Sequence, residues 1–156
     1  MKRALGYVGI VVLAVLAAAQ VAAANPLFGT WKLNLAKSKY TGMPIPKEMT
    51  RTVEADGDSV KYTNTGIAAD GSPISFGFTV KYDGKDYPIT GKAPFDADTI
   101  AIKRVNDYTY EAVLKKGGQA VGNTKVTVSK DGKITTLTGT GLADPTKKSV
   151  TVYDKQ

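Results

Sequence analysis

Apolar and polar residues alternate along most of the chain after residue 25. In the clearest example, segment 74–82, every second residue from Ile74 is apolar or aromatic, and most residues between them are small or polar. A period of two with one apolar face is typical of half-buried antiparallel strands. We therefore predict strands at 28–35, 47–55, 59–65, 74–82, 86–90, 99–105, 108–114, 122–129, 134–140 and 149–154.

Glycine-containing pairs separate many of these segments. Asp-Gly occurs at 56–57, 70–71, 83–84 and 131–132, and Gly-Gly at 117–118. Asp-Gly suits a type I′ hairpin turn, whose two central residues both need positive φ. Pro88 marks the fifth segment as a weak or edge strand. The stretch 36–46 contains Gly42, Pro44 and Pro46, so we predict an irregular loop there.

The predicted elements define the fold class. No segment after residue 25 shows a 3.6-residue period, so we expect an all-β protein. Short strands with hairpin-length connections form a meander, and closing a meander into a barrel removes its exposed edges. We predict an antiparallel barrel of 8–10 strands. The alternative, a two-sheet sandwich with Greek-key crossovers, needs longer connections than this chain offers.

The first 24 residues have the three parts of a secretory signal peptide. Lys2 and Arg3 precede an uncharged, mostly apolar stretch at 4–19, and Ala22–Ala24 supply small residues for cleavage. We predict cleavage before Asn25, a single domain over 25–156, and a periplasmic or secreted location. The alternative is an uncleaved anchor, since 5–24 nearly reaches the length of a spanning helix. After cleavage we expect no integral membrane span.

Composition narrows the chemistry. The chain has no cysteine and no histidine. This excludes imidazole-based catalysis, zinc sites built from His and Cys, and haem held by either residue. The Asp-Gly elements lack the ligand number that calcium requires. We expect no catalytic residues, no metal and no cofactor. Export without disulfides fits a bacterial envelope.

The positive charge does not predict a nucleic-acid partner. The formal net charge is +7, and Lys2 and Arg3 belong to the predicted signal peptide. No run of basic residues is longer than two. Nucleic-acid-binding surfaces are usually denser in Lys and Arg.

Three motifs carry a resemblance to known proteins. Residues 28–33, Phe-Gly-Thr-Trp-Lys-Leu, resemble the opening strand of the calycin group, which includes lipocalins and fatty-acid-binding proteins, and 152–155 resemble the last strand of the latter. The whole of 25–156 resembles small exported bacterial lipocalin-like proteins, through 25–34, the Tyr-Asp-Gly-Lys-Asp-Tyr-Pro at 82–88 and the same ending. The resemblance implies a calycin-type barrel in which Trp31 plugs the closed end and an arginine, Arg51 or Arg104, lies across its ring.

The chain also departs from these families. The two-helix lid of fatty-acid-binding proteins is replaced by the proline-containing loop, and the helix that follows a lipocalin barrel is missing. Of the carboxylate clamp, Tyr153 is matched but the arginine position holds Thr151. The resemblance therefore implies the fold but not the fatty-acid site.

Two functions are favoured by the sequence, and a hydrolase that uses a carboxylate pair is kept as a third hypothesis. The first is binding of a small apolar or amphipathic molecule inside the barrel. The second is an envelope structural or interaction module whose barrel is filled and holds no ligand. A void of several hundred Å3 would favour the first. Trp31 and Arg51 are predicted to be structural, and the candidate ligand contacts are Tyr62, Phe76, Phe78, Arg104, Tyr108 and Tyr110.

Overall fold

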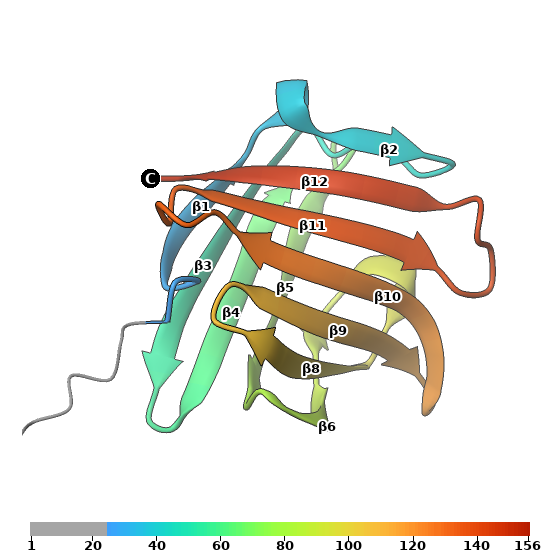
Figure 1. The fold of residues 1–156 in the computed structure, drawn as a ribbon. Helices are drawn as coiled ribbons and strands as arrows, with labels where there is room; N and C mark the ends of the chain where they lie inside the picture. The colour runs from blue at the N-terminus through green and yellow to red at the C-terminus, as the bar shows by residue number, and fades with distance from the viewer. Residues whose placement is uncertain (1–24) are drawn as a thin grey trace, which may run out of the picture.

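The described residues, 25–156, form one antiparallel sheet of twelve strands in the computed structural model (Figure 1). The predicted signal peptide lies outside these residues. Two short 3-10 helices, η1 (Leu35–Lys37) and η2 (Pro94–Asp96), interrupt the strands. The strands are β1 (Gly29–Leu33), β2 (Lys39–Thr41), β3 (Glu48–Asp56), β4 (Ser59–Ile67), β5 (Pro73–Val80), β6 (Asp83–Pro88), β7 (Thr90–Gly91), β8 (Thr99–Asn106), β9 (Thr109–Lys116), β10 (Gln119–Val128), β11 (Ile134–Gly141) and β12 (Lys148–Lys155).

The sheet curls into a nearly closed barrel. Its order is β6-β8-β9-β10-β11-β12-β1-β3-β4-β5-β7, with β2 beside β12. Pairing of β1 with β12 joins the two ends of the meander, and β8 to β12 cross the wall formed by β1 and β3 to β5 (Figure 1). The path ends at β6 and β7, which leaves a seam between them. The predicted all-β antiparallel barrel is confirmed, and so is the edge position of the strand that contains Pro88.

The strand count is higher than the 8–10 predicted. The two additional strands, β2 and β7, have three and two residues. A segment this short cannot show a period of two, so the hydrophobic pattern missed both. The prediction of an irregular loop at 36–46 was therefore partly wrong, because β2 lies within it and pairs with β12.

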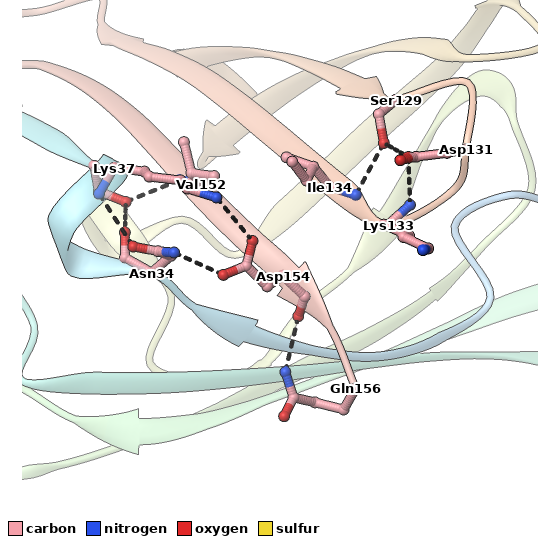
Figure 2. Close-up of polar contacts among 10 residues, drawn as sticks. Asn34, Lys37, Ser129, Asp131, Lys133, Ile134, Val152, Asp154 and Gln156 are labelled. Atoms are coloured by element: carbon pink, nitrogen blue, oxygen red, sulfur yellow. Dashed lines mark hydrogen bonds and ion pairs between the residues drawn. The ribbon is translucent and has the colours of Figure 1, made fainter.

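A polar cluster fastens this segment to the last strand (Figure 2). The Asn34 side chain accepts a hydrogen bond from the backbone of Lys37 at 3.1 Å and donates one to Asp154 at 2.6 Å. The Lys37 ammonium lies 3.6 Å from the same carboxylate. Next to the cluster, Asp131 caps the turn between β10 and β11 by accepting from the Lys133 backbone at 3.0 Å (Figure 2). The cluster thereby joins the ends of the first and last long strands of the barrel.

Most of the predicted turns occur, but Asp83 and Gly84 lie within β6 beside a register shift, so the turn predicted there was wrong. Between β3 and β4 the central residues are Gly57 and Asp58, and Gly57 has a φ of 61° while Asp58 is not in the positive-φ region. A glycine at the first central position is typical of type II′, so type I′ was the wrong assignment here. Gly117 and Gly118 both have positive φ, at 55° and 81°. They meet the type I′ requirement between β9 and β10.

Candidate functional site

The barrel encloses a cavity of about 180 Å3. The cavity lies between the two cases considered from the sequence, because the barrel is not filled and the void is smaller than several hundred Å3. A dry apolar cavity of about 150 Å3 is large enough to hold benzene or xenon. Residues from both walls and both ends of the barrel line it: Leu27, Trp31, Tyr40, Met43, Arg51, Val53, Tyr62, Phe76, Phe78, Pro94, Phe95, Ile100, Ile102, Tyr110, Ala112, Leu114, Thr124, Val126, Thr135, Leu137, Gly139, Ser149, Thr151 and Tyr153.

Four of the six predicted ligand contacts line this cavity. Tyr62 and Phe78 are cross-strand partners on β4 and β5, and their rings stack with centroids 4.7 Å apart. Phe76 is the inward-facing residue that precedes Phe78 in β5, and Tyr110 faces inward from β9. The period-two pattern placed all four on the inner face, three of them inside a regular ladder and Tyr110 at the last pair before a register shift.

Arg104 and Tyr108, the other two predicted contacts, do not line the cavity. Arg104 is exposed and donates to the Asp107 carboxylate at 3.0 Å and to the Asn106 carbonyl at 3.3 Å. Tyr108 is 39% exposed and belongs to the turn before β9. Arg104 still pairs with the inward-facing Tyr110, and the register shifts only after it, so Arg104 lies at the exposed end of β8. Tyr108 precedes the β9 ladder, so the alternation of β9 does not extend to it.

Trp31 forms part of the cavity floor. It is 1% exposed, and its indole Nε1 donates to the Leu27 carbonyl at 2.8 Å. The cation over its ring is Lys155, with Nζ 5.2 Å from the ring centroid. The expected arginine across Trp31 was therefore wrong, because the end of β12 brings a lysine to that place. The burial agrees with a structural role for Trp31.

A hydrogen-bonded group of tyrosines closes the same region. The Tyr62 and Tyr82 hydroxyls lie 2.8 Å apart. Asn25 donates to the Tyr82 hydroxyl at 2.9 Å and accepts from the Tyr110 hydroxyl at 3.2 Å. Burial raises the pKa of Tyr110 to about 12 and lifts the pKa of Tyr62 well above its ordinary value. These hydroxyls are therefore uncharged near neutral pH.

Arg51 lines the cavity and is held by a neutral partner. Its Nε donates to the Asn64 side-chain oxygen at 2.7 Å, and Asn64 has no exposed surface. The guanidinium carbon lies 5.4 Å from the ring centroid of Tyr153. Arg51 is partly buried and forms no ion pair with any residue from 25 to 156. From the sequence, Arg51 was one of two candidates to lie across the Trp31 ring. Its contacts with Asn64 and Tyr153 were not predicted.

Most of the hydroxyl-bearing residues of the wall lie on β10 to β12, beside the apolar Val126 and Leu137. Burial raises the pKa of Tyr153, while the positive charge of Arg51 opposes that rise. Thr135 is 3% exposed, and its hydroxyl has no hydrogen-bond partner among residues 25–156. A buried hydroxyl without a partner is costly, and this one borders the cavity. The other hydroxyl-bearing residues here are Thr124, Ser149 and Thr151.

The opposite end of the cavity is covered by η2. Phe95 and Asp96 have φ angles of 59° and 52°, a region that residues other than glycine rarely adopt. A β-carbon placed on Gly122 would lie 2.9 Å from the Phe95 ring, and one on Gly141 would lie 3.2 Å from it. The two glycines thus make room for the ring. Sequence pattern could not indicate this, because η2 lies outside every predicted strand.

Other features of the described residues offer no second site. A hollow of about 430 Å3 follows β4, β5 and β7 and shares Tyr62, Phe76 and Phe78 with the cavity wall. Within residues 25–156, no group of three or more His, Cys, Asp or Glu residues could hold a metal ion. No helix in this part of the chain has the length and hydropathy needed to cross a membrane.

Comparison with known proteins finds weak structural similarity. No protein-family model matches the sequence, and no curated protein matches it. Similar solved structures include the redesigned β-barrel mFAP1 bound to DFHBI, with 14% identity and a TM-score of 0.45 over 83% of this chain and 95% of that chain. The redesigned barrel mFAP0 bound to DFHBI has 13% identity and a TM-score of 0.44 over 83% and 99%. A biogenic amine-binding protein has 11% identity and a TM-score of 0.47 over 83% and 63%. Similarity at this level assigns neither a family nor a ligand.

Proposed function

We propose that this protein is an exported, non-enzymatic, calycin-type β-barrel that binds a small apolar or amphipathic molecule in its interior. The observation that carries the proposal is the cavity of about 180 Å3 between η2 and the Trp31 floor. Aromatic and aliphatic side chains form one part of its wall and hydroxyl groups another. Largely apolar cavities with a few placed polar groups are typical of small-molecule sites.

The size of the cavity limits the ligand. It is smaller than the roughly 300–1,000 Å3 common for drug-sized ligands, and close to a volume that holds one benzene ring. A single-ring compound or a short aliphatic molecule therefore fits the interior better than a long-chain lipid. A filled barrel, the alternative function, does not account for this space.

Filling the cavity should abolish binding. Ala112 is 6% exposed and lines the cavity, so Ala112→Leu places extra methyl groups where the ligand would lie. We expect at least a tenfold loss of toluene affinity, measured as saturable shifts of cavity methyl signals in NMR spectra. Ala55→Leu, at an exposed position of β3, should bind like the unmodified protein. Equal toluene binding by Ala112→Leu and the unmodified protein would contradict the proposed site.

Export makes a separate prediction about maturation. If 1–24 are a signal peptide, the protein recovered from the periplasm or medium of a bacterial host should begin at Asn25. Intact-mass measurement distinguishes this form from the full chain. Recovery of a form that begins at Met1 would contradict cleavage and favour an anchored protein.

A further inference from the structure

We propose that the ligand is a small carboxylate, with one ring or a short chain, whose carboxylate pairs with Arg51. This inference rests on the proposed function and names the substrate class of the same cavity. Arg51 is the sole charged residue among those of 25–156 that line the cavity. A cation removed from water is costly unless it is paired. Within the described structure no carboxylate supplies that partner.

The contacts of Arg51 within the described structure do not use the two terminal nitrogens, which are the donors that a carboxylate would bind. Its single hydrogen bond, from Nε to Asn64, fixes the direction of the guanidinium. The two terminal nitrogens make no hydrogen bond to any described residue. Contact with the Tyr153 ring holds the group from one face. A planar carboxylate can accept two parallel hydrogen bonds from a guanidinium held in this way.

The neutrality of Asn64 matters to this argument. An aspartate or glutamate at that position would pair with Arg51 and neutralise it. Asparagine orients the guanidinium through its side-chain oxygen and keeps the positive charge available. Asn64 is itself anchored, because its amide nitrogen donates to the Phe76 carbonyl at 3.5 Å.

Thr135 is a second, independent indication of a polar guest. Thr135 lines the cavity, and its buried hydroxyl has no partner within 25–156. Rotation of the side chain toward the cavity would let a ligand oxygen satisfy it. The rest of the guest would contact apolar side chains such as Phe76, Ile102 and Val126. The cavity therefore offers a cation, a free hydroxyl and an apolar remainder, which together match a small amphipathic acid.

Three matched probes test this inference on residues 25–156 at pH 7. Benzoate and benzamide have the same size and shape and differ in charge, while toluene reports on the apolar cavity alone. We expect benzoate to bind roughly tenfold to hundredfold more tightly than benzamide, as charged hydrogen bonds to a guanidinium imply. In Arg51→Met this preference should disappear, with toluene binding retained. Arg104→Met, whose side chain is on the surface, should keep the preference.

The outcomes separate the two proposals. Equal binding of benzoate and benzamide by the unmodified protein, or an unchanged preference in Arg51→Met, would overturn the carboxylate assignment while toluene binding still supported the cavity. Failure of all three probes to bind would overturn the proposed function itself. If Arg51→Met does not fold, Arg51→Lys keeps the charge but loses the paired donors, and should reduce the preference. The comparison of probes in the unmodified protein needs no variant.

Discussion

Replacing Trp31 with alanine is expected to lower the free energy of unfolding by about 3–5 kcal/mol, the range found for other buried large aromatics. The ring is 1% exposed and its Nε1 donates to the Leu27 carbonyl. The variant loses apolar burial and leaves a void at the floor of the barrel. Its denaturant midpoint should fall with little change in slope.

Lys155→Met is the matched control for this substitution. It removes the cation from the Trp31 ring but leaves the indole buried. Because an exposed cation–π contact contributes only about 0.5–1 kcal/mol, stability should change little while tryptophan fluorescence shifts. If Trp31→Ala melts within a degree or two of the unmodified protein, the ring is not a structural plug.

Gly91→Ala should open the seam of the barrel. Gly91 has a φ of 81° and pairs with Phe76 across the β5–β7 ladder. An added β-carbon would overlap the Ser75 carbonyl oxygen and lie 2.9 Å from the Phe76 Cα. Backbone atoms cannot move aside as a flexible side chain does, so β7 must separate from β5. We expect a loss of about 2–4 kcal/mol, combining left-handed strain with overpacking.

Gly84→Ala isolates the left-handed strain from the overpacking. Gly84 has a similar φ of 75°, but nothing lies within 4 Å of an added β-carbon. It should therefore lose only about 1–2 kcal/mol, the cost of the backbone conformation. Hydrogen exchange should accelerate in β5 and β7 of Gly91→Ala and stay unchanged there in Gly84→Ala. Equal destabilisation of the two variants would mean that the β5–β7 pairing contributes nothing.

The sequence was informative where the ladder is regular. Alternation identified the barrel and placed Tyr62, Phe76, Phe78 and Tyr110 on its inner face, because a period of two survives through uninterrupted pairing. The burial of Trp31 also agrees with its predicted role. These inferences need only local spacing, which one sequence provides.

The remaining features depend on contacts between distant segments. Arg51 could be assigned to the inner face, and it pairs with Trp31 across β1 and β3. Its hydrogen bond to Asn64 and its position over the Tyr153 ring follow from the arrangement of neighbouring strands. Lys155 reaches Trp31 because β12 pairs with β1. Phe95 covers the cavity because its backbone is in the left-handed conformation. A phenylalanine in the sequence does not indicate that conformation, as a glycine would. Arg104 does not line the cavity because it lies at the exposed end of β8, and Tyr108 because it belongs to the turn before β9.

The missing arginine of the fatty-acid-binding-protein carboxylate clamp does not exclude a carboxylate ligand. Thr151 stands where fatty-acid-binding proteins place an arginine, so the resemblance did not imply their fatty-acid site. The structure puts Arg51 beside Tyr153 instead of over Trp31, so a cation still borders the cavity from another strand. A small carboxylate is therefore compatible with the interior, whereas the volume disfavours a long-chain fatty acid.

The most direct test of the central claim is a crystal structure of residues 25–156 exposed to xenon gas. Xenon enters dry apolar cavities without specific polar contacts, so its binding reports the space itself. We predict an ordered xenon atom between the Phe76 and Val126 side chains and the Trp31 floor, and its absence in Ala112→Leu crystals treated in the same way. An interior filled by side chains, with no xenon bound, would contradict the binding function and favour a structural module.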